Sequence, residues 1–178
     1  SLVGYTNAGK STLLNRLTGA GVLVEDKLFS TLDPVTRRIR LPSGRDLLLT
    51  DTVGFIQKLP PSVVAAFRAT LEEIQESAFL LHVVDITHPS ARAQADVVNN
   101  VLGELNLDTK PRILVLNKTD LLDQGATEAA TDAFSDLASA EPRSVLTSVL
   151  TGDGLDRLLA EIDEVVGASV SEGVEAGA

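Results

Sequence analysis

A glycine-rich loop near the start of the chain has the residue types of a phosphate-binding site. Residues 4–11, GYTNAGKS, match the pattern G-x-x-x-x-G-K-[ST], and a helix is expected directly after them. Glycines let the backbone approach phosphate oxygens closely, and N–H groups at a helix N-terminus donate to those oxygens. Lys10 adds a positive charge for the β- and γ-phosphates, and the Ser11 hydroxyl can ligate Mg²⁺. The predicted nucleotide contacts of this loop are Gly4, Tyr5, Thr6, Asn7, Ala8, Gly9, Lys10, Ser11 and Thr12.

A second polar motif predicts which base the nucleotide carries. Residues 117–120, NKTD, end the apolar run RILVLN, at the strand end where open parallel sheets bind ligands. Asp120 can accept hydrogen bonds from N1–H and the 2-amino group of guanine, and adenine has neither donor. The Lys118 stem can cover the base plane, while Asn117 can either bond the base edge or brace the phosphate loop. The motif therefore predicts GTP rather than ATP.

Ser148 and Val149 are a candidate second contact for the base. They follow the last predicted strand and precede the turn LTGDG. We expect their backbone N–H groups to face the guanine oxygen.

The segment DTVG, residues 51–54, has the pattern of a γ-phosphate sensor. Asp51 ends a predicted strand and can hold Mg²⁺ through water, and Gly54 offers a backbone N–H at close approach. Thr31, in the loop LFSTLDPVTR, is the candidate second hydroxyl ligand, and Phe29 is a candidate nucleotide contact in the same loop. Two alternatives stay open: the ligand is Thr36, or Thr31 only forms a turn beside Pro34. The predicted metal ligands are Ser11, Thr31 and Asp51, and the predicted catalytic residues are Lys10, Gly54 and Thr31.

Phe55 stands directly after this segment, where a glutamine that orients the attacking water is often found. A phenyl ring can neither donate nor accept a hydrogen bond. The Asn7 carbonyl can supply the missing charge by ligating K⁺ beside the phosphates, or Asn7 can simply tighten its loop. We expect slow GTP hydrolysis that a partner accelerates. The alternative is a GTP-binding interaction module with negligible turnover.

The elements that must position these residues alternate along the chain. After the loop and its helix (10–17), the pattern predicts a hairpin of strands 36–41 and 46–50 and a helix entered at Pro60-Pro61-Ser62. Predicted strands 79–85, 112–117 and 143–148 then alternate with predicted helices 90–105, 127–138 and 155–166. This order indicates a three-layer α/β fold, with a mostly parallel sheet, one antiparallel edge strand and helices on both faces. We expect one domain over residues 1–166 and a flexible tail over 167–178.

Composition narrows the class of protein. The 178 residues contain no Cys and no run of about 18 apolar residues, so neither disulfides, thiolate metal sites nor a membrane helix is expected. The chain contains no Met, and we expect a piece of a longer cytoplasmic protein without a signal peptide. The net charge of −10 argues against direct binding of free nucleic acid, since twelve acidic and two basic residues follow from Leu121 onward. One basic run is either an exposed hairpin face or a contact for a nucleic-acid-containing partner: Arg37, Arg38, Arg40 and Arg45.

Three further polar residues are not assigned to chemistry. His82 lies in a strand of buried type and His88 in a turn, and neither has a second ligand at metal-binding spacing. Asp85 ends a predicted strand, where we expect it to cap a helix or brace a loop.

Taken in order, four segments resemble one known family. GYTNAGKSTLLNRLTG, LFSTLDPVTRRIRLPSG, LLLTDTVGFIQKLPPSVVAAFRATLEE and LHVVDITHP are similar to the GTPase domain of HflX proteins, which belong with the Obg-like group of translation-factor-class P-loop GTPases. The resemblance extends over residues 1–165. It implies a Mg²⁺-dependent, GTP-hydrolysing switch that associates with the large ribosomal subunit, and a family N-terminal domain that is absent here. Val149 departs from the Ala usual in the family, and we expect at most weaker base binding because that contact is through backbone.

Overall fold

The computed structural model describes residues 1–19, 34–55, 68–124, 135–139 and 141–175. Within these residues the strands form one six-stranded sheet in the order β2-β3-β1-β4-β5-β6. β2 and β3 pair antiparallel at one edge, and the other neighbours pair in parallel. The strands are β1 (Leu2–Gly4), β2 (Val35–Arg40), β3 (Asp46–Asp51), β4 (Leu80–Asp85), β5 (Arg112–Asn117) and β6 (Ser144–Leu146). This confirms the predicted sheet, including its antiparallel edge.

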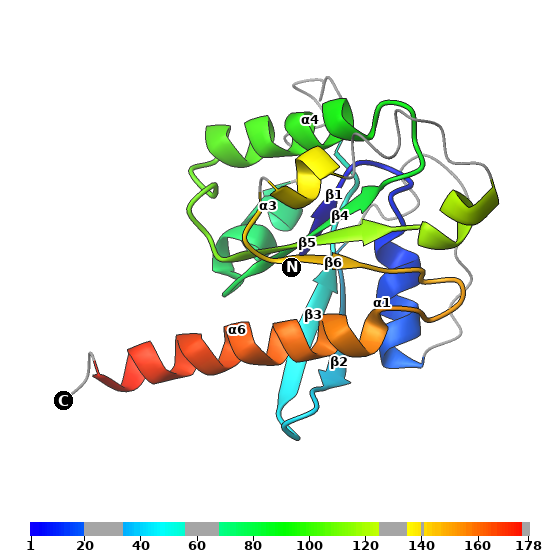
Figure 1. Cartoon of the computed structure of the whole chain (residues 1–178). Coiled ribbons are helices and arrows are strands. Elements are labelled where there is room, and N and C mark those ends of the chain that lie inside the picture. Colours follow the sequence, from blue (N-terminus) through cyan, green and yellow to red (C-terminus); the bar gives the residue numbers. More distant parts are fainter. Residues whose placement is uncertain (20–33, 56–67, 125–134, 140, 176–178) are drawn as a thin grey trace.

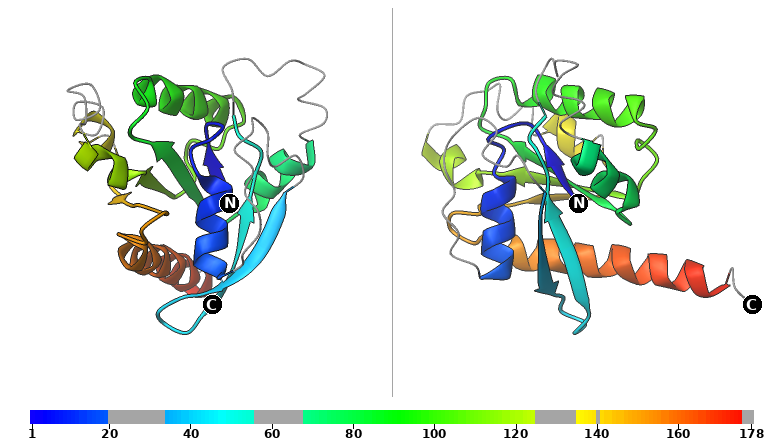
Figure 2. Two further views of the ribbon diagram at one scale, coloured as in Figure 1. Left: turned by 90° about the vertical axis from the view of Figure 1, so that its right-hand side faces the viewer. Right: turned by 180° about the vertical axis from the view of Figure 1, so that it is seen from behind.

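Helices cover both faces of the sheet, which confirms the three-layer prediction (Figure 1 and Figure 2). One face packs on α1 and α6 through buried residues such as Leu14 and Leu158. The other packs on α3 and α4 through Ile74 and Leu102. The helices are α1 (Lys10–Thr18), α3 (Arg68–Glu76), α4 (Ala91–Glu104), α6 (Leu155–Glu175) and the 3-10 helix η1 (Thr119–Gln124), which the sequence did not predict. None of the helices in the described ranges is long and apolar enough to cross a membrane.

Local sequence explains why these elements begin and end where they do. α1 ends because Gly19 adopts the left-handed region, with φ 65°, and returns its N–H to the Asn15 carbonyl. β4 and β5 are central, and every residue of each is buried except one at an end. Their continuous apolar runs are the pattern of parallel strands that are covered on both faces. Both strands end at the same edge of the sheet, where Asp85 and Asn117 are register partners. The polar motifs follow directly after these strand ends.

The largest difference from the predicted elements lies at the end of the chain. The sequence pattern ends the last helix at Val166, but α6 continues to Glu175. The predicted helix end is therefore wrong, and most of the segment 167–178 is helical. Extending an existing helix needs no new nucleus, and this segment contains no proline to stop it. For the helix predicted over 127–138, the structure describes residues 135–139, which are helical; the helix entry at Pro60 lies outside the described residues.

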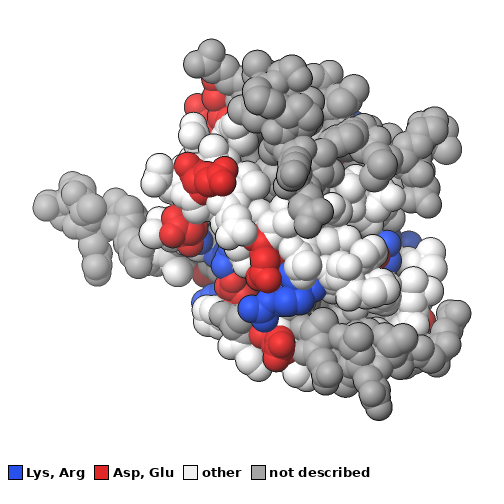
Figure 3. All heavy atoms as spheres, turned by 90° about the horizontal axis from the view of Figure 1, so that it is seen from above, with Lys and Arg blue, Asp and Glu red and all other residues white. Residues whose placement is uncertain are grey.

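The basic run of the sequence is divided by the hairpin. Arg37, Arg38 and Arg40 are exposed on β2, and the last two lie 3.6–3.9 Å from Asp46 carboxylate oxygens. Arg45 instead joins the hairpin turn to α6, through a 2.6 Å ion pair with Asp163. The face drawn in Figure 3 carries acidic and basic side chains close together, without a broad basic area among its described residues. Arg37, Arg38 and Arg40 thus form an exposed strand face, and the nucleic-acid-containing partner stays a prediction.

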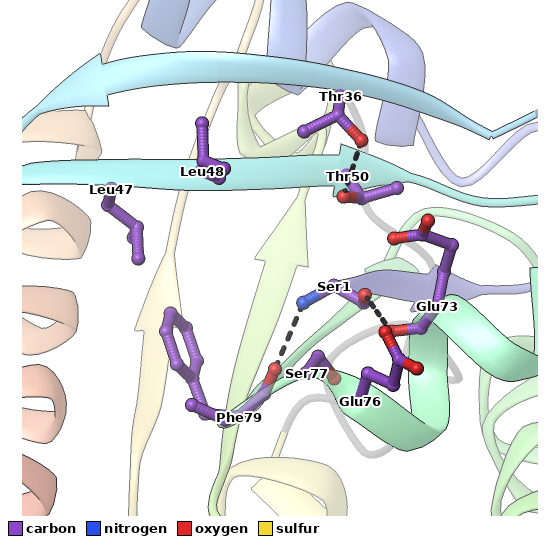
Figure 4. Close-up of a pocket in the computed structure, with 10 residues that line it drawn as sticks. Ser1, Thr36, Leu47, Leu48, Thr50, Glu73, Glu76, Ser77 and Phe79 are labelled. Carbon is purple, nitrogen blue, oxygen red and sulfur yellow. Dashed lines mark hydrogen bonds between the residues drawn. The ribbon is translucent and has the colours of Figure 1, made fainter.

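The pairing between β1 and β3 is limited to the first residue of β1. β1 pairs with β3 at one position, Leu2 opposite Asp51, whereas β3 pairs with β2 along its whole length. A pocket of about 240 Å³ opens there, between the hairpin, α3 and the start of β1 (Figure 4). Its lining residues are Ser1, Thr36, Leu47, Leu48, Thr50, Glu73, Glu76, Ser77, Ala78 and Phe79. Parallel sheets bind ligands at the carboxyl ends of their strands, so a pocket at the amino end of β1 is not the predicted nucleotide site.

Candidate functional site

The phosphate loop lies between β1, at the centre of the sheet, and α1. Its two motif glycines are required by close contacts. A Cβ atom on Gly4 would lie 2.3 Å from the Val83 carbonyl oxygen, and one on Gly9 would lie 2.4 Å from the Asn117 amide nitrogen. Gly9 also has φ 102°, which side-chain-bearing residues rarely adopt. The loop can therefore run against β4 and β5 only with glycine at both positions.

Lys10 is held over this loop with its side chain almost fully buried. Its Nζ donates to the carbonyl oxygens of Gly4 and Tyr5, both at 3.3 Å. Burial lowers the pKa of Lys10 to about 8, and the neighbouring Asp51 carboxylate opposes that shift. An ammonium held by neutral carbonyls, with one carboxylate nearby, is ready to pair with a polyphosphate.

Two of the three predicted metal ligands meet in the structure. The Ser11 hydroxyl donates to Oδ2 of Asp51 at 2.5 Å, although these residues are 40 positions apart. Asp51 is 2% exposed, at the end of β3. Hydroxyl and carboxylate oxygens are the hard ligands that Mg²⁺ prefers, and Mg²⁺ sites commonly use one or two protein groups plus phosphates. The oxygen ligands of Ser11 and Asp51 therefore fit Mg²⁺.

The third predicted ligand cannot be placed, because Thr31 and Phe29 lie outside the described residues. Its rival, Thr36, is in β2 and within 2.9 Å of the Thr50 hydroxyl, so that it lines the pocket at the other end of β1. Thr36 is therefore not brought to Ser11 in this structure.

The residues after β3 pair with the phosphate loop. The N–H of Phe55 donates to the Gly4 carbonyl at 3.0 Å, and the N–H of Thr6 donates to the Phe55 carbonyl at 3.1 Å. A Cβ on Gly54 would lie 2.7 Å from the Thr6 Cα, so this position needs glycine because two backbones touch. Gly54 is thus placed against the loop, as a γ-phosphate sensor requires.

Phe55 is a core residue. Its ring is 4% exposed and belongs to the apolar cluster of Val3, Ile74, Leu80 and Leu102. Its side chain is therefore directed into the layer between the sheet and α3 and α4, while its backbone pairs with the phosphate loop. In this structure, position 55 therefore presents no side chain to the phosphate loop.

Asn117 joins the phosphate loop to the base-binding loops. Its Nδ2 donates to the Ala8 carbonyl at 3.0 Å, and its Oδ1 accepts from the Val149 N–H at 3.2 Å and the Thr147 hydroxyl at 3.4 Å. The side chain is 2% exposed. Of the two roles considered for Asn117, the structure supports the bracing role.

Ser148 acts on the base motif through its side chain, which the sequence did not indicate. Its hydroxyl donates to Oδ1 of Asp120 at 2.5 Å and accepts from the Thr151 N–H at 3.1 Å. The Ser148 N–H donates to the Asp153 carbonyl at 3.0 Å, and the Val149 N–H bonds Asn117. Both N–H groups expected to face the guanine oxygen therefore have protein partners here. The hydroxyl of Ser148 instead orients the carboxylate that is predicted to read the base.

The other predicted residues take simple positions. Lys118 follows β5 with φ 71°, and its Nζ lies 2.6 Å from Oδ2 of Asp85. Asn7 also has a positive φ, 62°, and is exposed with Thr12, whereas Tyr5 and Thr6 are half-buried. Asp85 does brace a loop, as expected, through its bonds to Thr87.

Neither histidine contributes to the site. His82 is 1% exposed in β4, and its Nε2 has no hydrogen-bond partner among the described residues. Burial, followed by the charges of Arg112 and Lys10, lowers the pKa of His82 to about 3. His88 is exposed and accepts a hydrogen bond from the Ser90 N–H, as a turn residue does.

Comparison with known proteins agrees with this geometry. Residues 1–118 match the family model described as "50S ribosome-binding GTPase". The GTPase HflX of Caldanaerobacter subterraneus is 50% identical over 163 residues, which make up 92% of this chain and 35% of that protein. The GTPase HflX of Escherichia coli is 42% identical over 97% of this chain and 39% of its own length. The chain thus spans little more than a third of the length of these relatives.

Two solved structures with the same fold contain guanine nucleotides. A GTP-binding protein from Sulfolobus solfataricus in complex with GDP superposes with a TM-score of 0.70 and 31% identity, over 94% of this chain and 51% of that one. A single-residue variant of Era from Aquifex aeolicus, bound to GDP and AlF4⁻, gives a TM-score of 0.73 and 26% identity, over 90% of this chain and 54% of that one.

Proposed function

Because the chain belongs to the family of 50S ribosome-binding GTPases and has the sequence of the HflX-type GTPase domain, we propose that it binds GTP with Mg²⁺ and hydrolyses it to GDP and phosphate. The observation that carries this proposal is the amide of Asn117. It bonds the phosphate loop at Ala8 and the base-side loop at Val149, so that the two predicted halves of a nucleotide site lie on one edge of the sheet. A triphosphate bound at Lys10 and a guanine bound at Asp120 then belong to the same ligand, GTP.

In this proposal the residues of the phosphate side hold the reacting end of GTP. Lys10 exchanges its carbonyl partners for β- and γ-phosphate oxygens, and the Gly54 N–H donates to the γ-phosphate. Ser11 and Asp51 would hold Mg²⁺, which would supply positive charge to offset the negative charge of the phosphates. A water molecule attacks the γ-phosphorus and gives up a proton to a phosphate oxygen, the bond to the β–γ bridging oxygen breaks, and GDP leaves with that electron pair.

The attacking water needs an orienting group that Phe55 does not provide. The phosphate loop offers its backbone N–H groups, and Asn7 is exposed on that loop with a side-chain carbonyl that suits K⁺. A bound partner is the second source of an orienting or charged group. We propose slow intrinsic hydrolysis that K⁺ at Asn7 or the partner accelerates.

The proposed partner is the large ribosomal subunit. The description of the matching family model supports this choice. The chain spans little more than a third of the length of its HflX relatives. The test therefore also measures whether this domain alone binds the large ribosomal subunit.

The test is GTP hydrolysis by the chain in K⁺ and in Na⁺, each with and without large ribosomal subunits. Stimulation by K⁺ without subunits, lost in Asn7→Ala, supports the cation at Asn7. Stimulation by subunits in either salt supports a partner that completes the site. Gln75→Ala is the matched control for Asn7→Ala, because it also removes an exposed side-chain amide, but from α3, and it should leave both stimulations intact.

A GTP-binding module with negligible turnover is the second candidate, because Phe55 removes the usual water-orienting side chain. It predicts tight binding of fluorescent GTP without phosphate release in all four conditions. Equal affinity for GTP and ATP would contradict both candidates.

A further inference from the structure

Asp85 lies beside the base motif although it belongs to another strand. It ends β4, and its register partner on β5 is Asn117, the first residue of NKTD. The Ile86 N–H donates to the Asn117 carbonyl at 3.2 Å, which continues the pairing one residue past the end of β4. The chain therefore brings a carboxylate from β4 to the residue that follows Asn117.

The two oxygens of this carboxylate have different partners. Oδ1 accepts from the N–H and the hydroxyl of Thr87, at 3.0 and 2.6 Å, and this local contact braces the turn after β4. Oδ2 accepts from Nζ of Lys118 at 2.6 Å, across 33 positions of sequence. The Asp85 side chain is 14% exposed and that of Lys118 is 34% exposed, so this ion pair is less screened by solvent than a surface pair.

Lys118 is held at both ends. Its backbone has φ 71°, a strained conformation for a side-chain-bearing residue. Its neighbours fix that conformation, since Asn117 bonds two loops and the Thr119 N–H donates to the Thr147 carbonyl at 3.2 Å. At the other end of the side chain, the ion pair with Asp85 fixes the position of the Lys118 Nζ. The four-carbon stem between these two points then has little rotational freedom.

We infer that Asp85 is a positioning residue for the guanine base, which it serves by holding Lys118. With Nζ paired to Asp85, the stem of Lys118 is pre-ordered as an apolar surface against which a base plane can lie, and its ordering entropy is lost before the nucleotide binds. The inference rests on the proposed function, because it concerns the same base site. The carboxylate contacts described for Asp85 are to Thr87 and Lys118, on the base side, so its effect falls on binding and not on the chemical step.

The experiment compares Asp85→Asn with Thr87→Val. The asparagine keeps an oxygen for Thr87 but removes the charge that holds Lys118; the valine removes the hydroxyl contact and leaves the ion pair intact. We expect Asp85→Asn to weaken binding of fluorescent GDP and GTP by the same factor, about tenfold, because the base is common to both. KM for GTP rises and kcat stays near that of the parent protein. Thr87→Val lowers the melting temperature and leaves nucleotide affinity unchanged.

A double substitution shows whether Asp85 acts through Lys118. In a Lys118→Met background, Asp85→Asn should cause no further loss of affinity. An equal loss in both backgrounds, or a loss in Thr87→Val as large as in Asp85→Asn, would overturn the inference. If Asp85→Asn folds poorly, Asp85→Glu, which keeps the charge, should restore part of the affinity; a glutamate no better than asparagine also counts against it. Failure of the parent protein to bind guanine nucleotides would instead reject the proposed function.

Discussion

The phosphate side and the base side of the candidate site are built by different means. On the phosphate side, backbone meets backbone: Gly4 lies against Val83, and Gly54 against Thr6. On the base side, loops are joined by side chains, with Ser148 bonded to Asp120 and Asn117 bonded to both neighbouring loops. Among the described residues, the Asn117 side chain bonds to both regions.

The phosphate side therefore determines whether a nucleotide fits, and the base side determines which nucleotide is preferred. A backbone cradle recognises phosphate, which every nucleotide carries, and tolerates no added atoms. A side-chain network recognises one base, and single atoms of it can be exchanged without a clash. Substitutions should therefore damage folding on the phosphate side and change ligand preference on the base side.

The largest effect is expected for Gly4→Ala. Its Cβ would lie 2.3 Å from the Val83 carbonyl, in the centre of the sheet, and relief requires backbone movement. We expect the free energy of unfolding to fall by about 3 kcal/mol, measured by urea denaturation. Gly103→Ala, in α4 with nothing within 4 Å, is the control and should stabilise by about 0.5–1 kcal/mol. Equal stability of Gly4→Ala and Gly103→Ala would contradict the claim that the close backbone contact at Gly4 is needed for folding.

The next effect is a change of base preference in Asp120→Asn. An amide cannot accept from both guanine donors, but it can donate to the 2-oxygen of xanthine. GTP affinity should fall about a hundredfold and XTP should bind better than GTP, while the melting temperature changes little. Binding is measured by competition with a fluorescent nucleotide. Asp108→Asn, which changes an exposed acid away from the motif, is the control. An unchanged preference for GTP would contradict the assignment of Asp120.

The smallest effect concerns His82, whose strand lies between those that carry the two regions. It pairs with Val3 on β1 and Leu114 on β5. Its pKa is lowered from 6.5 to about 3 in the folded state, so the unfolded chain binds more protons between these values and stability falls as pH falls through that window. At pH 5 the loss is about 2 kcal/mol relative to neutral pH. His82→Leu should remove this slope in urea unfolding curves, and the exposed His88→Gln should leave it. A slope that persists in His82→Leu would show that other groups cause it.

Much of the site could be predicted because its chemistry depends on residue types at fixed spacing. GYTNAGKS specifies glycines where the chain must touch its neighbours, and NKTD places a carboxylate after a buried strand. The roles of Asn117 and Phe55 could not be decided in the same way. An amide can serve a ligand or a loop, and an aromatic ring after a strand can lie on either face, so that only tertiary packing selects between these outcomes.

One contact that the sequence did not indicate and one wrong helix end have a shared cause, which is that a local pattern does not show which distant groups compete for a hydrogen bond. The Val149 N–H is predicted to face a base, but the side-chain oxygen of Asn117, 32 positions away in sequence, accepts its hydrogen bond. The pattern ends α6 at Val166 because the apolar stripe weakens there, although helix hydrogen bonds need no stripe to continue.

The burial of Phe55 has a consequence for how this hydrolase type can change over evolution. Its side chain lies in the core, and its backbone is paired with the phosphate loop through both its N–H and its carbonyl. Exchange for glutamine would bury an amide among aliphatic side chains and bring nothing to the phosphates. In the arrangement seen here, a glutamine at this one position would not reach the phosphates, and we expect faster turnover to come from other positions or from a binding partner.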